Sequence, residues 1–241
     1  MTIEKFIYST EHIIITEQTK PKDLLIQLRS HDTESFDYSF FTGALNYSIS
    51  KEYGLNDPKI LRIHFESGLF HDIGKLGMER DFINYPGAFT LQMYNEMKKH
   101  AIGGGELLMK LNAPQEYIDT ANYHHCNFDG SGYPGNLFEE EIPFVSRLTR
   151  LSDSIDAYLS KRCYKEGGPA NEALSDVMNY SGVSYDPKII DAFAKVHNKV
   201  ISQCHKSGED RPSKKMYMHY LVLIYLSEFE FTSFDDILEK F

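Results

Sequence analysis

Histidine and aspartate residues gather at four places along this sequence, and these side chains are typical metal ligands. Two are pairs, His71-Asp72 and His124-His125, while His100 lies between the pairs and Asp153 follows them. Imidazoles mixed with carboxylates suit Fe, Mn, Zn or Ni better than Ca or Mg, which prefer shells of oxygen atoms. An aspartate that bridges two metals about 3.5–4 Å apart is the usual arrangement for phosphoester hydrolysis. A further pair, His31-Asp32, is interpreted as incidental, because a dipeptide alone is a weak motif.

Helices must carry these residues, because apolar positions recur every three or four residues and strand signals are few. Gly, Pro and capping residues predict helices over residues 22–30, 34–53, 58–70, 90–112, 114–123, 143–159, 170–180 and 187–203, with two more in 216–241. The β-branched run at 12–16 (HIIIT) is a candidate strand. The fold class is therefore all-α. A long loop rich in Gly, Pro and Asn, at 127–143, is of the kind that often has a function.

The length and charge of the chain limit its class. Its 241 residues predict an N-terminal segment at 1–21, a main domain at 22–205 and a helical extension at 206–241 that packs on the domain. The net charge of −10 argues against a non-specific nucleic-acid binder. No apolar run is long enough for a membrane span, and no secretory signal is visible. Three widely separated cysteines fit a reducing cytoplasm.

The motifs and their order resemble the HD-GYP family, a branch of the HD-domain metal-dependent phosphohydrolases. The resemblance runs from about residue 22 to about residue 200. It rests on HDIGK at 71–75, His100 with Gly104, HHCNFDGSGYP at 124–134, DSIDA at 153–157 and RCYK at 162–165, followed by Tyr185-Asp186-Pro187. The resemblance implies an HD-domain helical bundle that hydrolyses cyclic di-GMP, or a related cyclic dinucleotide, to the linear product pGpG, to GMP or to both.

The resemblance also implies a role for individual residues. The metal ligands would be Glu34, His71, Asp72, His100, His124, His125 and Asp153. They would hold two divalent metals, or three with Glu34, with Fe or Mn expected and Zn or Ni as alternatives. Asp72 would bridge two metals, and Lys75 would neutralise charge on the reacting phosphate.

Four residues would bind the substrate through phosphate contacts and base stacking, namely Lys75, Tyr133, Arg162 and Lys165. Their alternative interpretations are surface charges for the three cations and loop packing for Tyr133. The loop at 127–143 contains Gly132-Tyr133-Pro134 and is called the GYP loop. A diguanylate cyclase bound through this loop and a second copy of the chain are further expected partners. Cys126 is expected not to be a ligand.

One position departs from the family. The first helix of the family carries a Glu-x-x-x-His pair, and here the residues at that spacing are Glu34 and Tyr38. Residues four apart share one helical face, so the geometry of the pair is retained while its chemistry is altered. A phenol, with a reference pKa of about 10, binds a metal only when deprotonated. The alternative function is therefore a catalytically weak sensor or adaptor that binds a cyclic dinucleotide or a diguanylate cyclase.

Overall fold

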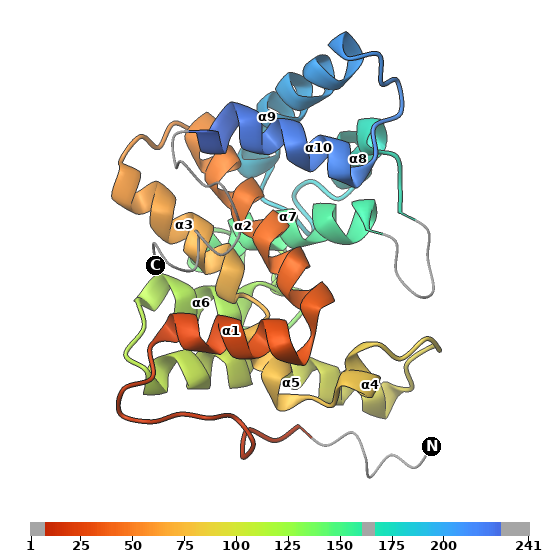
Figure 1. Ribbon diagram of the computed structural model, residues 1–241. Helices are drawn as coiled ribbons and strands as arrows, with labels where there is room; N and C mark the ends of the chain where they lie inside the picture. Colours follow the sequence, from red (N-terminus) through yellow and green to blue (C-terminus); the bar gives the residue numbers. More distant parts are fainter. Residues whose placement is uncertain (1–7, 161–166, 228–241) are drawn as a thin grey trace.

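The computed structural model describes residues 8–160 and 167–227, and within these ranges the chain is a bundle of helices (Figure 1). The helices are α1 (Pro21–His31), α2 (Thr33–Tyr53), α3 (Pro58–Phe70), α4 (Arg80–Ile83), α5 (Leu91–Lys110), α6 (Gln115–Tyr123), α7 (Phe144–Leu159), α8 (Ala173–Met178), α9 (Pro187–Lys206) and α10 (Lys214–Leu221). Short turns of 3-10 helix are η2 (Ile73–Gly77), η3 (Glu139–Glu141) and η4 (Ala170–Glu172). These described residues contain no strand, so the predicted all-α class is confirmed.

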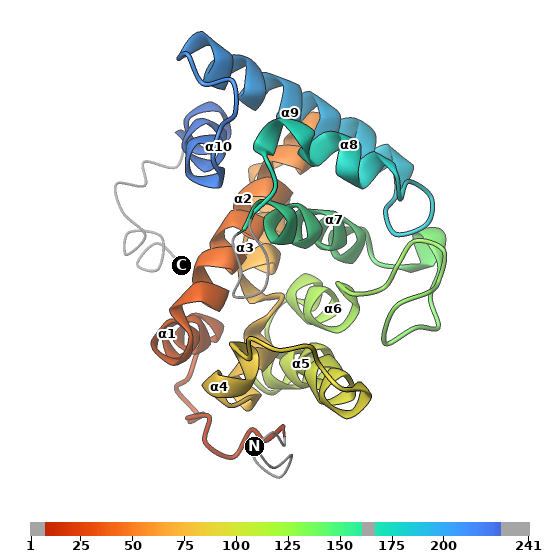
Figure 2. The ribbon, with the colours of Figure 1, turned by 90° about the vertical axis from the view of Figure 1, so that its right-hand side faces the viewer.

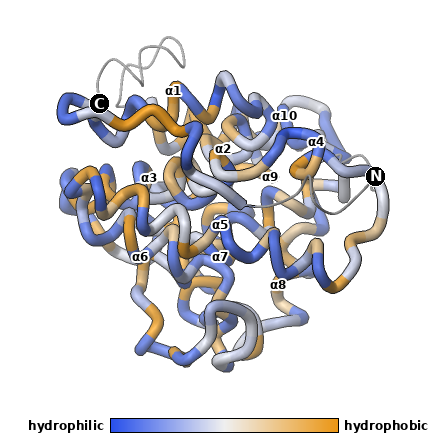
Figure 3. The backbone as a smooth tube through the Cα atoms, turned by 90° about the horizontal axis from the view of Figure 1, so that it is seen from below, coloured by the Kyte–Doolittle hydropathy of each residue, from blue (hydrophilic) through white to orange (hydrophobic). Residues whose placement is uncertain are grey.

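Helix α2 forms the centre of the bundle. It packs against α3, α7 and α9 and also contacts α1 and α10, and nearly every residue from Phe41 to Ser50 is buried. A helix buried on all sides is expected only inside a core. Helices α9 and α10 lie at one end of the molecule and α4 and α5 at the other (Figures 1 and 2). Along most outer helices, hydrophobic and hydrophilic residues alternate, which gives each helix one buried face (Figure 3).

The predicted helix boundaries are set by capping side chains. Asp32 accepts a hydrogen bond from the backbone N–H of Ser35 at the start of α2, and Thr90 accepts one from Met93 at the start of α5. Gly54 ends α2 with a φ of 111°, a left-handed conformation that glycine adopts without strain. Most helices therefore begin and end within a few residues of their predicted bounds.

The candidate strand at residues 12–16 is wrong. This segment is irregular, and the side chain of Gln27 takes the place of a partner strand. The amide of Gln27 accepts from Ile14 N–H at 3.2 Å and donates to Ile14 C=O at 3.0 Å. Hydrophobic β-branched residues need a neighbouring strand to complete a sheet, and in the described part of the chain none is available.

The predicted C-terminal extension contains α10, which packs against α9 and contacts α2. A turn of π-helix, η5 (Val222–Leu226), follows it. The rest of the predicted second helix lies outside the described residues. The boundary between residues 205 and 206 stays a prediction.

Candidate metal centre

Three packed elements bring the predicted ligands together. His71 directly follows α3, Asp72 directly precedes η2, and His100 lies in the middle of α5. The turn η2 presses on α5, and a Cβ atom at Gly74 would lie 1.9 Å from the carbonyl oxygen of His100. Glycine in the HDIGK motif therefore allows the close approach that puts Asp72 next to His100.

Backbone carbonyl groups hold three of the imidazoles in one orientation. The Nδ1 atom of His71 lies 2.7 Å from Gly68 O, and that of His100 lies 2.6 Å from Met97 O. The Nδ1 atom of His124 lies 3.0 Å from Thr120 O. Carbonyl oxygen only accepts hydrogen bonds, so each Nδ1 is the protonated nitrogen of its ring. Each Nε2 atom is then left with a lone pair, as a metal ligand requires.

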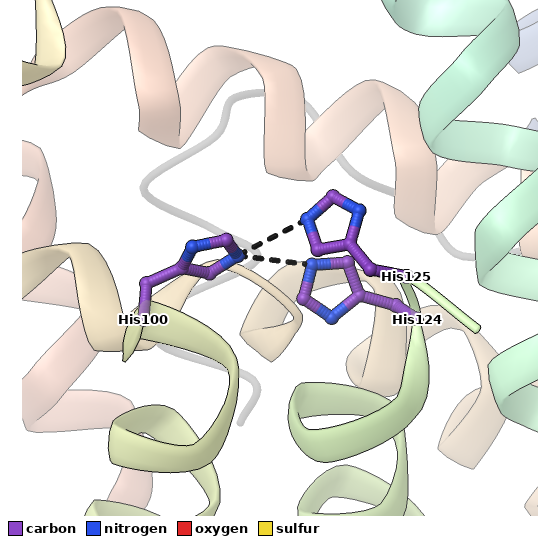
Figure 4. A group of neighbouring side chains, drawn as sticks. All are labelled: His100, His124 and His125. Carbon is purple, nitrogen blue, oxygen red and sulfur yellow. Dashed lines mark hydrogen bonds between the residues drawn. The ribbon is translucent and has the colours of Figure 1, made fainter. Parts of the chain in front are cut away.

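The Nε2 atoms of His100, in the middle of α5, and of His124 and His125, just after α6, converge on one another (Figure 4). The Nε2 atom of His100 lies 3.3 Å from that of His124 and 3.2 Å from that of His125. In the neutral tautomers that the carbonyl contacts select, both Nε2 atoms of the His100–His124 pair are acceptors. A cation between the rings would satisfy this arrangement.

Asp72 lies between two sets of imidazoles and directs one carboxylate oxygen toward each. Its Oδ1 atom is 3.3 Å from His100 Nε2 and 3.8 Å from His124 Nε2. Its Oδ2 atom is 3.2 Å from His71 Nε2 and also accepts a short hydrogen bond from Lys75. The side chain is about 6 % exposed. A buried carboxylate with ligand atoms on both sides has the geometry of a bridge between two metals.

Charges within the cluster set the protonation of its side chains. Burial lowers the pKa of His71, but the carboxylates of Asp72 and Asp153 raise it above the ordinary value. Burial raises the pKa of Asp72, but the ammonium of Lys75 and the imidazoles of His71 and His100 lower it well below the ordinary value. For His124 and His125, burial and the neighbouring imidazoles lower the pKa well below that of an exposed histidine. The carboxylate is therefore ionised and these two imidazoles are neutral near pH 7.

The ligand atoms fit metal ions. Two groups have atoms within 4.8 Å of one another, His100 with His124 and His125, and His71 with Asp72 and His124. The Nε2 atom of His71 is buried and makes no hydrogen bond, so it is an unsatisfied acceptor that a metal would satisfy. Nitrogen and oxygen ligands in this mixture favour transition metals.

Two predicted ligands lie outside these groups. Asp153 projects from α7, and its Oδ1 atom is 3.8 Å from His71 Nε2, so it borders the cluster. Glu34, in the first turn of α2, belongs to neither group. It accepts a hydrogen bond at 3.3 Å from the hydroxyl of Tyr38, and the ammonium of Lys214 lies 4.7 Å from the centre of the Tyr38 ring.

The GYP loop places Tyr133 over the cluster. Its ring stacks on that of His125, with a centroid distance of 4.5 Å, and burial raises the pKa of its hydroxyl. Sequence reasoning missed the residues beyond it. The ammonium of Lys98 lies 4.4 Å from the ring centre of Tyr94 and 5.4 Å from that of Tyr133. The spacing of four between Tyr94 and Lys98 was the available signal, since such pairs share a helical face.

The remaining predicted residues have other places. Arg162 and Lys165 lie outside the described residues. His31, which the sequence marks as incidental, has its Nε2 atom 2.7 Å from the carbonyl oxygen of Met78, just after η2. Its neighbour Asp32 caps α2. Cys126 is buried, its thiol donates to the carbonyl of Tyr133, and it belongs to neither group of ligand atoms.

Comparison with known proteins identifies the class to which this fold and cluster belong. Residues 12–189 match the HD domain family, so the chain belongs to that family. The resemblance to its HD-GYP branch is confirmed as well. A solved HDG"Y"P protein from Bdellovibrio bacteriovorus has the same fold, with a TM-score of 0.58 at 19 % identity over 72 % of this chain and 56 % of that one.

Two curated relatives have named activities. A cyclic di-GMP phosphodiesterase of Thermotoga maritima is 33 % identical over 88 % of this chain and 57 % of its own length. A 3'3'-cGAMP-specific phosphodiesterase of Vibrio cholerae is 33 % identical over 58 % of this chain and 27 % of its own length. The match therefore spans 57 % of the length of the first relative and 27 % of the length of the second. No helix in the described ranges has the length and apolar character of a membrane span.

Proposed function

We propose that the chain hydrolyses cyclic di-GMP, or a related cyclic dinucleotide, in a metal-dependent reaction. The observation that carries the proposal is the position of Asp72, whose two carboxylate oxygens face different imidazoles at 3.2 Å and 3.3 Å. The activities named for the two curated relatives support the choice of substrate.

The residues have distinct tasks in this reaction. His71 and Asp153 would hold one metal, His100, His124 and His125 a second, and Asp72 would bridge them. Bound metals would lower the pKa of a water molecule and neutralise the phosphate oxygens. The water oxygen would bond to phosphorus as the bond between phosphorus and the ribose oxygen opposite it breaks, and the proton that the water gives up would end on that ribose oxygen. We infer Fe or Mn, with Zn or Ni as alternatives, from the mixed nitrogen and oxygen ligands.

Lys75 and Tyr133 would orient the substrate above the ligands. The ammonium of Lys75 reaches the carboxylate of Asp72, so it can also meet the negative charge that grows on the phosphate in the transition state. Tyr133 and Lys98 would offer an aromatic surface and a cation to one nucleotide. The substrate contacts predicted for Arg162 and Lys165 stay predictions.

One observation favours the second candidate, a sensor or adaptor that binds the dinucleotide with little turnover. Tyr38 replaces the histidine of the family and hydrogen-bonds to Glu34. A neutral phenol holding that carboxylate leaves no ligand pair for a third metal. Three further expectations stay predictions from the sequence: a diguanylate cyclase partner at the GYP loop, a homodimer and a cytoplasmic location.

Turnover measured together with metal content tests both candidates. The full chain, purified without oxygen and loaded separately with Fe(II), Mn(II), Zn(II) or Ni(II), would be given cyclic di-GMP and cyclic GMP-AMP. We expect about two metals per chain and release of a linear dinucleotide. Tight binding of cyclic di-GMP without product would support the sensor instead. Absence of both metal and nucleotide binding would contradict both functions.

A further inference from the structure

A cationic cavity lies where the C-terminal segment meets α2 and α7. Its volume is about 590 Å³, within the range of ligand pockets. Its lining includes Tyr38 of α2, Ser160 at the end of α7, Pro169, Arg211 just before α10, and Lys214 and Lys215 at the start of α10. Three of these six residues belong to the stretch beyond residue 189, where the match to the HD domain family ends.

The described residues that line this cavity carry a charge opposite to that of the whole chain. The chain carries −10, yet the described lining residues include three cations and no carboxylate. One cation is already balanced, because the ammonium of Lys214 donates to Asp156, which is fully buried, and to Ser160 Oγ at 2.8 Å. Arg211 and Lys215 remain as exposed positive charges at the cavity. A concave surface with such charges concentrates anions.

Close packing determines the shape of the cavity. A Cβ atom at Gly167 would lie 2.3 Å from the carbonyl oxygen of Leu159, so this wall can press on the end of α7 only as glycine. On the opposite side, the ammonium of Lys214 lies 4.7 Å from the ring centre of Tyr38 and 4.8 Å from that of Phe41. These contacts fix α10 against α2 and α7.

Helix α7 connects this cavity with the proposed metal centre. Asp153, which borders the ligand cluster, and Ser160, which lines the cavity, are seven residues apart on the same helix. At 1.5 Å per residue, that is about 10 Å along the helix axis. A cyclic dinucleotide carries two phosphodiester groups, and only one can react at the metals at a time.

We propose that Arg211 and Lys215 bind the phosphodiester group of a cyclic dinucleotide that is not being cut. This inference rests on the proposed function, since it names a second contact with the same substrate. Arginine and lysine suit this task because they form charge-assisted hydrogen bonds to phosphate oxygens. Lys214 would act as a positioning residue that holds α10 in place through Asp156.

The test compares two substrates on the metal-loaded full chain. The double variant Arg211→Gln/Lys215→Gln removes both charges and keeps chain length. Cyclic di-GMP has two phosphodiesters, whereas bis(p-nitrophenyl) phosphate has one. We expect the ratio of kcat/KM for cyclic di-GMP to kcat/KM for the single ester to fall at least about 10-fold, from two lost contacts to phosphate. The variant Arg211→Lys/Lys215→Arg keeps both charges and should retain most of the wild-type ratio. The control Lys110→Gln, at the end of α5, should leave the ratio unchanged.

A binding measurement separates failure of this inference from failure of the proposed function. The Kd for cyclic di-GMP, measured by calorimetry on the full chain in EDTA, should rise at least about 10-fold in the double variant. If the Kd rises in the double variant while wild type shows no turnover, the proposed hydrolase is rejected and the inference is kept. An unchanged Kd, or wild type that binds no cyclic di-GMP, would overturn the inference. The inference would also be overturned if the double variant lost binding of pyrophosphate but kept binding of cyclic di-GMP, because that result would indicate a separate anion site.

Discussion

The buried ligand cluster and the Glu34–Tyr38 pair show two outcomes for residues that the same family resemblance predicts to bind metal. In the cluster, backbone carbonyls fix the imidazoles so that their Nε2 atoms converge beside Asp72. In the pair, the carboxylate is hydrogen-bonded to a phenol and an ammonium lies over the ring. From this difference we expect unsatisfied acceptor atoms that face one another to mark a metal centre better than ligand-type residues at the right spacing.

The largest effect is expected from removing the bridge. Asp72→Ala should lose most bound metal and lower turnover by about 10³-fold or more, because both sets of imidazoles lose their shared carboxylate. Metal analysis and turnover measure it, and Asp191→Ala, an exposed aspartate of α9, is the control. An Asp72→Ala protein with its full metal content would contradict the dinuclear arrangement and remove the contrast between the two regions.

The sequence predicted the cluster well because its residues follow helix-ending and helix-packing rules. His71 and His124 each directly follow a helix, and capping residues such as Thr90 determine where these helices begin. It did not predict contacts that depend on distant segments. The approach of Lys214 to Tyr38 joins residues 176 positions apart, and periodicity within a helix cannot predict such a contact.

The second prediction concerns conversion of the pair into a metal site. Tyr38→His alone restores the family's ligand types, but the Lys214 ammonium would remain near the new imidazole. Repulsion of roughly 3 kcal/mol for each unit of metal charge follows at about 5 Å and an effective dielectric constant near 20. We therefore expect extra metal only in Tyr38→His/Lys214→Met, as one additional ion per chain at pH 7 by elemental analysis.

Single variants are the controls for this conversion. Lys214→Met alone should bind no more metal than wild type, because Tyr38 remains a neutral phenol. If Tyr38→His alone bound the extra ion, the ammonium would not govern the site. If turnover fell with Tyr38→His while metal content was unchanged, Tyr38 would have its own role with substrate.

A smaller effect is expected on stability. Lys214→Met removes the ammonium that donates to the fully buried carboxylate of Asp156. We expect the free energy of unfolding to fall by about 1–3 kcal/mol, measured by urea denaturation. The control is Lys188→Met, which breaks an exposed pair with Glu140 and should cause no measurable change. Equal losses in both variants would show that α10 is not anchored through Asp156.

The smallest effect concerns histidines that belong to neither region. Burial lowers the pKa of His64 and of His197 to about 4, against about 6.5 in the unfolded chain. Between these values the unfolded state binds more protons than the folded state, so the free energy of unfolding should fall as pH falls. Each histidine contributes up to about 1.4 kcal/mol per pH unit.

His197→Leu tests that slope, because His197 packs between the rings of Phe193 and Tyr217 and leucine retains the apolar contact. Urea denaturation of both proteins at pH 7, 6 and 5 should show wild type losing stability faster by about 1 kcal/mol per pH unit. Titration of the cluster histidines is common to the two proteins and cancels in the difference. An identical slope would mean that His197 accepts a proton in the folded state, and that burial outside the metal centre does not hold a histidine neutral as it does inside.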